Sequence, residues 1–217
     1  IEPFPLLSLI DDSKIQLKAT EIFAKQKFPR NIGLSKIERK PKNSKIRIGY
    51  FSADFKEHPV ATLTAELYET HDRNQFEVYA FSFGLDTNDE MNLRIKAGVD
   101  YFYDVRKMSH KEVVMLSRSF EIDIAINLGG YTQQTRTEIF AMQAAPIQVN
   151  YLGYSGTMGV GYMNYLIADH TLIPKDRQQH YSEKIAYLPN SFMVNDTKNK
   201  LSNRVFTRSE TGLPTNG

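Results

Sequence analysis

The sequence contains no cysteine in its 217 residues. Disulfide bonds, thiolate metal sites and a cysteine nucleophile are therefore excluded, and the absence fits a reducing compartment. The sequence also lacks any apolar run near the roughly 20 residues that cross a bilayer. Its first residues, 1–5, have no signal-peptide character. We therefore expect a cytoplasmic location and no membrane partner.

Strong charge of one sign is missing as well. The formal net charge is only +2, which gives no reason to expect nucleic acid as a partner. The basic residues do gather in one stretch, but no aromatic residues lie between the charges, as nucleic-acid binding would favour. We interpret this stretch as a solvated linker. Its charged members are Arg39, Lys40, Lys42, Lys45 and Arg47.

Short β-rich runs alternate with amphipathic segments over most of the chain. The run 122–128 is continuously apolar, which predicts a central, buried strand. The alternation predicts an α/β fold, namely a Rossmann-like, mostly parallel sheet with helices on both faces. The predicted strands are 46–52, 77–83, 101–105, 122–128, 147–153, 165–169 and 184–188.

Several helix starts can be read directly from the sequence. A first helix is predicted over about 12–27, with Asp11 or Asp12 as its cap. Another begins at Pro59, since proline suits the first helical position. Three more helices are predicted to follow capping boxes, in which Ser or Thr precedes Glu by three residues. These boxes are Thr87–Glu90, Ser109–Glu112 and Thr135–Glu138.

The chain divides into three parts on this interpretation. Residues 1–44 form a helical extension and basic linker, 45–195 form the Rossmann-like lobe, and 196–217 form a tail. The chain has no initiator Met and finishes in residues typical of a loop, so we interpret it as part of a longer protein. Ligands of such sheets lie beyond the carboxyl ends of the strands. The informative loops are therefore 53–59, 84–87, 128–134 and 152–161.

Common cofactor motifs are absent from these loops. The loop 53–59 contains no glycine, whereas a dinucleotide-binding domain shows G-x-G-x-x-G at this point. The glycine-rich run 152–161 lacks the G-K-[ST] ending of an ATP-binding P-loop. The remaining histidines, His71, His110, His170 and His180, show no metal-ligand pairing with carboxylates. We predict neither a metal ion nor a cofactor.

His58 is the candidate that the first loop offers instead. It precedes Pro59 and therefore lies at the amino terminus of a predicted helix, at the edge of the sheet where ligands bind. The helix dipole disfavours an imidazolium there. A neutral imidazole is what a general base or a hydrogen-bond partner requires. The alternative is that His58 only caps the helix or packs beneath the loop.

The second informative loop contains Gly129 and Gly130, followed by Tyr131 and Thr132. Paired glycines directly after a central strand permit positive φ angles and a close approach of a ligand to the backbone. Thr132 adds a hydroxyl, and Tyr131 adds a flat face with a polar tip. A tight turn between strand and helix would use the glycines equally well.

Taken together and in this order, the loops resemble the protein O-GlcNAc transferase family, which includes the SPINDLY-like proteins. The resemblance runs from about Pro3 to Pro189. The matching stretches are IRIGYFSADFKEHPV (46–60), IDIAINLGGYT (122–132), PIQVNYLGYSGTMG (146–159), YLIAD (165–169) and QHYSEKIAYLP (179–189). PFPLLSLIDD (3–12) resembles the segment between the family's helical repeats and its catalytic region.

The resemblance implies the N-terminal lobe of a two-lobed GT-B glycosyltransferase. Such enzymes transfer N-acetylglucosamine from UDP-GlcNAc to Ser or Thr of intracellular proteins without a metal, and SPINDLY-like relatives can instead transfer fucose from GDP-fucose. The implied partners are protein acceptors, a UDP-sugar donor, upstream tetratricopeptide repeats and a C-terminal catalytic lobe. We expect the repeats and the second lobe to lie outside this chain, and the chain alone to be nearly inactive.

The family pattern also implies which residues form the site. His58 takes the position of the family's active-site histidine. The resemblance places substrate-binding positions at Asp54, Pro59, Asn127, Gly130, Tyr131, Thr132, Gly153 and Tyr154.

Inverting transfer is the mechanism that we expect, with an acceptor hydroxyl attacking the anomeric carbon opposite the departing UDP. His58 is either the base or a group that positions the sugar or acceptor. Two other classes remain open. One is a non-catalytic interaction module on a Rossmann-like scaffold, and the other is a nucleotide-dependent oxidoreductase, which the missing G-x-G-x-x-G disfavours.

Overall fold

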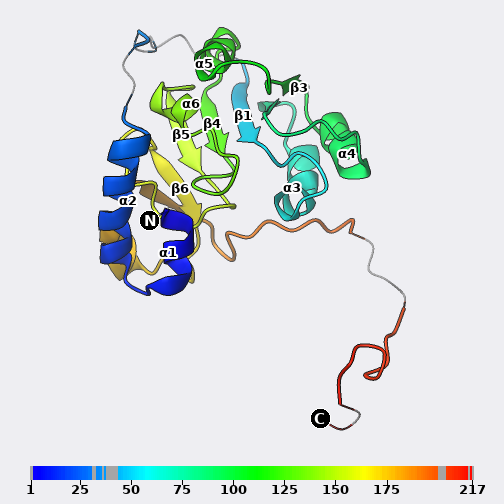
Figure 1. The fold of residues 1–217 in the computed structure, drawn as a ribbon. Coiled ribbons are helices and arrows are strands. Elements are labelled where there is room, and N and C mark those ends of the chain that lie inside the picture. Colours follow the sequence, from blue (N-terminus) through cyan, green and yellow to red (C-terminus); the bar gives the residue numbers. More distant parts are fainter. Residues whose placement is uncertain are drawn as a thin grey trace.

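The computed structural model describes residues 2–30, 33–35, 37, 44–199, 204–214 and 216. Within them lies one seven-stranded sheet in the order β3-β2-β1-β4-β5-β6-β7, and every pairing between its strands is parallel. Figure 1 shows the helices packed around this sheet. The strands are β1 (Ile46–Ser52), β2 (Phe76–Ser82), β3 (Tyr101–Asp104), β4 (Ile124–Asn127), β5 (Ile147–Asn150), β6 (Tyr165–Ala168) and β7 (Lys184–Tyr187).

The strand order confirms the Rossmann-like prediction. From β1 the chain first winds outward through β2 to β3, then returns to the other side of β1 and continues from β4 to β7. The direction of winding therefore reverses between β1 and β4. In doubly wound sheets, ligands bind in the crevice at this switch point, outside the carboxyl ends of the strands. Most predicted strands shorten by one to three residues, and the strands follow one another along the chain as predicted.

Helices cover both faces of the sheet, as predicted. On one face, α3 (Pro59–Thr70) and α4 (Glu90–Gly98) enclose a core that contains Tyr50 and Ile126. On the other face, α2 (Ser13–Lys27), α5 (His110–Ser119) and α6 (Glu138–Ala141) cover Phe51 and Ala125. Neighbouring residues of one strand enter opposite cores because side chains alternate across a strand. The continuous apolar character of the strands follows from burial on both faces.

Two of the predicted helix caps are present. The Asp12 carboxylate accepts hydrogen bonds from the amides of Lys14 and Ile15, and so caps α2. Ser109 and Glu112 form the complete capping box of α5. Each cap satisfies amides that lack a partner within the helix.

The other two predicted capping boxes are wrong. Asp89 caps α4, because its carboxylate accepts from the amide of Asn92, and Thr87 instead donates its hydroxyl to that carboxylate. The hydroxyl of Thr135 donates to the carbonyl oxygen of Gly130 at 2.6 Å, and α6 starts without a side-chain cap. At α4 the carboxylate of Asp89 replaces the threonine as the cap, and at α6 the Thr135 hydroxyl is engaged by a loop carbonyl. Local spacing reveals neither outcome.

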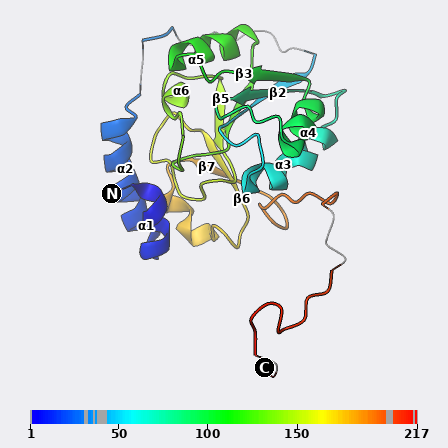
Figure 2. The ribbon, with the colours of Figure 1, turned by 45° about the vertical axis from the view of Figure 1, so that its right-hand side comes forward.

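The N-terminal segment packs on the loops that follow β4 and β5. The structure adds a helix that the sequence analysis did not predict, α1 (Pro3–Leu9). Ala24 of α2 is fully buried, and Phe23 and Phe28 contact the ring of Tyr131. Figure 2 shows α1 and α2 together at one side of the sheet. The helical part of the predicted extension therefore shares a core with the predicted lobe.

Part of the predicted basic linker can be compared with the structure. Arg39, Lys40 and Lys42 lie outside the described residues. Arg47 belongs to β1, where its guanidinium pairs with Glu77 at 2.9 Å and Glu121 at 3.3 Å. No helix in the described ranges is long and apolar enough to span a membrane.

A segment without regular structure, residues 189–199, crosses from β7 to α3, and we call it the strap (Figure 1). Near β7, its Phe192 amide donates to Asp169 Oδ2 at 2.7 Å, and Tyr151 Oη donates to the Phe192 carbonyl at 2.9 Å. The described residues 204–214 beyond it extend away from the sheet in both views.

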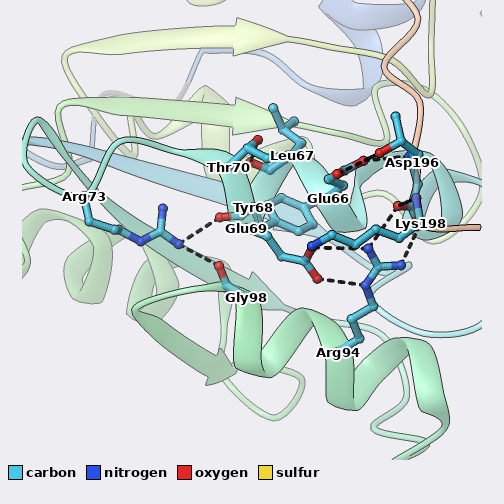
Figure 3. Close-up of polar contacts among 11 residues, drawn as sticks. Glu66, Leu67, Tyr68, Glu69, Thr70, Arg73, Arg94, Gly98, Asp196 and Lys198 are labelled. Atoms are coloured by element: carbon cyan, nitrogen blue, oxygen red, sulfur yellow. Dashed lines mark hydrogen bonds and ion pairs between the residues drawn. The ribbon is translucent and has the colours of Figure 1, made fainter.

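Charged side chains hold the far end of the strap (Figure 3). Arg94 of α4 donates to Asp196 at 2.5 and 3.0 Å and to Glu69 of α3 at 2.8 Å. Lys198 Nζ donates to Glu69 at 2.5 Å. The Asp196 side chain is fully buried, and Arg94 holds the pKa of both carboxyl groups, Asp196 and Glu69, below their usual values. The strap is thus fastened to both helices on this face.

Candidate active site

Three loops leave the carboxyl ends of neighbouring strands at one rim of the sheet. They are the β1 loop (53–58), the β4 loop (128–137) and the β5 loop (151–164). Phe51 of β1 is paired with Asn127 of β4, which in turn is paired with Asn150 of β5. The β1 and β4 loops flank the switch point. The topology therefore brings the predicted site loops to the same rim.

His58 caps α3 at this rim. Its backbone is extended, and its Nδ1 accepts a hydrogen bond from the amide of Val60 at 3.2 Å. Pro59 follows as the first helical residue, is exposed, and has no N–H that needs a partner. The imidazole is 38% exposed. The structure thus contains the predicted cap, while the ring is not buried among aliphatic neighbours.

The hydrogen bond from Val60 corresponds to one neutral tautomer of the ring. Nδ1 accepts in this bond, so it carries no proton, and the neutral imidazole holds its single hydrogen on Nε2. Nε2 then donates a hydrogen bond. In this state His58 can orient an oxygen atom of a substrate, but a base would need a free lone pair on Nε2.

Asp54 lies four residues before His58 in the β1 loop. Its Oδ2 is 3.8 Å from Nδ1 of His58, and its side chain is 17% exposed. Burial raises the pKa of Asp54, while the nearby His58 and Lys56 oppose the rise. The amide of Asp54 donates to Ser52 Oγ at 2.9 Å, which holds its backbone against the end of β1.

Asn127, at the end of β4, organises the start of the β4 loop. Its Oδ1 accepts from the amides of Gly129 and Gly130, each at 3.1 Å, and its side chain is buried. Gly130 has a φ of +55°, and a Cβ there would lie 2.3 Å from the Cβ of Tyr154. The glycine pair predicted a positive φ and a close approach of a ligand, and in the structure the group that approaches Gly130 is a tyrosine.

Tyr131 and Thr132 both make internal contacts. The Tyr131 side chain is 5% exposed, its ring stacks on Phe28 with centroids 5.7 Å apart, and its hydroxyl donates to the Met158 carbonyl at 2.7 Å. Burial raises its pKa. Thr132 is partly buried, and its hydroxyl donates to the Gly129 carbonyl at 2.8 Å. A substrate contact at Tyr131 would therefore have to use its backbone.

The β5 loop is also built from internal contacts. Tyr154 is 1% exposed and donates its hydroxyl to the Thr157 carbonyl at 3.3 Å, while its own carbonyl accepts from Asn150 Nδ2 at 2.8 Å. A Cβ at Gly153 would lie 2.2 Å from the Leu128 carbonyl oxygen. Gly153 therefore allows the backbones of the β4 and β5 loops to touch.

Glu183 is a buried residue at this rim to which sequence reasoning gave no role. Its carboxylate accepts from the Met158 amide at 2.6 Å and from the Thr157 hydroxyl at 2.8 Å. Burial raises the pKa of Glu183, and these hydrogen bonds oppose the rise. Its only sequence signal was its position within 179–189, a stretch that matched the family pattern. Glu183 holds the β5 loop in place.

The predicted site residues thus separate into two groups. Asp54, His58 and Pro59 lie together at the accessible β1 loop, whereas Asn127, Gly130, Tyr131 and Tyr154 form the interior of the β4 and β5 loops. Among the described residues, no three His, Asp or Glu side chains form a group that could hold a metal ion.

Comparison with known proteins adds independent information. The family model described as Glycosyl transferase family 41 matches residues 13–212. The chain is 39% identical over 183 residues to the "Probable UDP-N-acetylglucosamine--peptide N-acetylglucosaminyltransferase SEC" of Arabidopsis thaliana, with 82% of this chain and 19% of that protein covered. It is 38% identical over 156 residues to the "UDP-N-acetylglucosamine--peptide N-acetylglucosaminyltransferase" of Caenorhabditis elegans, with 70% of this chain and 13% of that protein covered.

A solved structure extends the match to the fold. The O-GlcNAc transferase mutant K341M of Thermobaculum terrenum superposes with a TM-score of 0.75 at 28% identity, covering 84% of this chain and 35% of that chain. The chain thus spans about a fifth or less of the two curated relatives and about a third of the solved structure. The family model covers nearly the whole chain, and both relatives are similar to it over more than two thirds of its length. The chain therefore belongs to glycosyl transferase family 41.

Proposed function

We propose that this chain forms the N-terminal lobe of the catalytic region of a protein O-GlcNAc transferase. The full-length protein would transfer N-acetylglucosamine from UDP-GlcNAc to Ser or Thr hydroxyls of cytoplasmic proteins, with inversion at the anomeric carbon. The similar plant and nematode proteins are named as a probable and an assigned UDP-N-acetylglucosamine–peptide N-acetylglucosaminyltransferase, which supports this donor and this class of acceptor.

The observation that carries the proposal is the position of His58. Its half-exposed imidazole lies in the β1 loop, beside the switch point of the sheet. A sugar nucleotide bound outside the carboxyl ends of β1 and β4 would lie against this ring. Neither neighbouring loop contains the phosphate-binding glycine pattern of an oxidoreductase domain.

The chemistry requires removal of one proton. The acceptor hydroxyl oxygen forms a bond to the anomeric carbon while the bond from that carbon to the diphosphate oxygen breaks, and the hydroxyl proton passes to a base. A positioned base contributes roughly 10²–10⁴ in rate, and His58 is our candidate. We expect the charge on the departing UDP to be stabilised by the C-terminal lobe, without a metal ion.

Mass spectrometry of a Ser/Thr peptide incubated with the full-length protein tests this proposal. UDP-GlcNAc should add one N-acetylhexosamine, and His58→Ala should lower the rate by about 10²-fold or more. Addition of deoxyhexose from GDP-fucose would instead support the SPINDLY-type alternative. Failure to bind or use either donor would favour a non-catalytic module, and unchanged turnover in His58→Ala would remove His58 from the site.

A further inference from the structure

Nδ1 of His58 has two neighbours that make opposite demands on it. The Val60 amide, 3.2 Å away, is a donor and needs a lone pair on Nδ1. The Asp54 carboxylate, 3.8 Å away, is an acceptor and needs a proton on Nδ1. A neutral imidazole carries one N–H, so it can satisfy only one of these neighbours at a time.

The choice of partner decides what Nε2 can do. When Nδ1 accepts from Val60, the proton resides on Nε2, which then donates. When Nδ1 donates to Asp54, Nε2 presents a lone pair and can take a proton from an acceptor hydroxyl. The structure contains the first arrangement, whereas general-base catalysis requires the second.

Asp54 is placed to stabilise the second arrangement. No donor among the described residues makes a hydrogen bond to its carboxylate in the structure, although the side chain is only 17% exposed. A partly buried carboxylate without a donor gains from an N–H within reach. The separation of 3.8 Å exceeds a hydrogen bond by less than 1 Å, so a small rotation of either side chain brings the two groups into contact.

The Val60 amide can give up its hydrogen bond to His58 because of its position in α3. Its amide belongs to the first turn of α3, and amides there have no partner within the helix. At the helix end, water can replace His58 as the acceptor. The existing hydrogen bond from Val60 can therefore exchange for one from His58 Nδ1 to Asp54. The hydrogen bonds within α3 do not depend on either.

We propose that Asp54 is a positioning residue that competes with the Val60 amide for Nδ1 of His58 and thereby frees Nε2 to act as a base. The exchange moves one proton from Nε2 to Nδ1 through solvent and leaves the charge of the ring unchanged. During transfer, Nε2 takes the hydroxyl proton, and the Nδ1–H bond to Asp54 stabilises the resulting imidazolium. The catalytic consequence rests on the proposed transferase function, whereas the competition for Nδ1 does not.

NMR of the 217-residue chain labelled with ¹⁵N-histidine tests the competition directly. The chain has only five histidines, and the spectrum of His58→Asn identifies the His58 signals. The long-range ¹H–¹⁵N pattern distinguishes the two neutral tautomers at a pH above the ordinary histidine pKa of about 6.5. We expect wild type to populate the Nδ1–H tautomer at His58 and Asp54→Asn to lose it, because the new amide N–H can donate to Nδ1.

Glu57→Gln is the matched control. It removes one negative charge from the same loop, next to His58, but its side chain is exposed. Its tautomer pattern should match wild type. Identical His58 patterns in wild type and Asp54→Asn would overturn the proposal.

Kinetics of the full-length protein provide a second readout. Asp54→Asn should lower kcat by about tenfold or more at an unchanged donor KM, because the orientation of the base is lost while binding is kept. Asp54→Glu should restore part of kcat, and Glu57→Gln should leave it unchanged. An unaltered kcat in Asp54→Asn also overturns the proposal. If wild type transfers no sugar, the proposed function fails, but the NMR result still decides whether Asp54 controls the tautomer.

Discussion

On the β1 side of the rim, the side chains of Asp54 and His58 are partly exposed and 3.8 Å apart, whereas across the switch point Tyr131 and Tyr154 are 5% and 1% exposed. In the described part of the chain, the Asp54 carboxylate and the Nε2 atom of His58 make no hydrogen bond. The buried tyrosines use their hydroxyls on backbone carbonyls of the β5 loop. Residues that follow one family pattern thus differ in their surroundings, because one side keeps polar atoms accessible and the other uses them for internal contacts.

This division follows from what covers each loop. The β4 and β5 loops lie beneath α1 and α2, where Phe4, Phe23 and Phe28 contact the two tyrosine rings. In the described part of the chain, the β1 loop has no comparable aromatic cover on the His58 ring. Side chains of the supporting side should therefore control stability, and those of the β1 loop should control activity.

Tyr154→Ala should have the largest effect. Removal of a fully buried aromatic ring leaves a cavity where the β4 and β5 loops meet, which typically lowers the free energy of unfolding by about 3–5 kcal/mol. Urea denaturation followed by circular dichroism measures the loss. Tyr101→Ala is the control, because Tyr101 is 44% exposed and its loss should be clearly smaller. Equal losses would contradict the assignment of Tyr154 to the supporting side.

Gly130→Ala should have the next largest effect. The added Cβ would lie 2.3 Å from Tyr154, and the φ of +55° is unfavourable for alanine. Such overpacking typically destabilises by about 1–3 kcal/mol. Gly161→Ala is the matched control in the β5 loop, since no atom lies within 4 Å of its Cβ position. Thermal unfolding of the two variants should separate them, and a stable Gly130→Ala would mean that the loops adjust freely.

Arg94→Ala should have a smaller and local effect. Its ion pairs fasten the strap to the surface of α3 and α4 and are not part of the core. Loss of the ion pairs with Asp196 and Glu69 should ease local opening of the strap by about 1 kcal/mol. Hydrogen exchange of the amides in 189–199 measures this, with amides of β4 as the internal control. Faster exchange throughout the sheet would show that the strap instead stabilises the whole fold.

The difference in opening free energy of the strap between wild type and Arg94→Ala should depend on pH with a defined sign. Arg94 depresses the pKa of Asp196 and Glu69, so their contribution is present above the ordinary carboxyl values of about 4 and is lost as pH falls through the depressed values. The difference between wild type and Arg94→Ala should therefore be constant from pH 7 to about pH 5. It should shrink below about pH 4.

His58→Asn should have the smallest effect on stability. Asparagine is a preferred N-cap and can accept a hydrogen bond in the first turn of α3, so the free energy of unfolding should stay within about 0.5 kcal/mol of wild type. Transfer by the full-length protein should nevertheless fall by about 10²-fold or more. A large loss of stability would place His58 on the supporting side and contradict the comparison.

Local sequence patterns predicted much of the fold for physical reasons that hold over a few residues. The apolar run 122–128 predicted the central strand β4, and Ser109–Glu112 predicted the start of α5. The capping-box pattern failed at α4, where Asp89 rather than Thr87 accepts the hydrogen bond from the first turn of the helix. The helix α1 was missed because its seven residues are too few for a periodic pattern to be read.

The site was predictable to a similar extent. The sequence placed His58 at a helix start and indicated a positive φ at the glycine pair, and the structure contains both features, the second at Gly130. It gave no reason to select Glu183, because nothing in the neighbouring residues indicates that this carboxylate reaches the amide of Met158. The prediction that the Tyr131 and Thr132 positions line a sugar pocket stays a prediction.

The sequence by itself determined the order of strands and helices, the position of His58 before Pro59, and the glycines where the loops turn. These depend on backbone preferences and on apolar periodicity, which neighbouring residues set. Only the tertiary structure decided which rim side chains face the crevice. Tyr131 turns inward because Phe23 and Phe28, about 100 residues earlier in the chain, cover it. His58 stays accessible because no aromatic ring among the residues that the structure describes covers its imidazole.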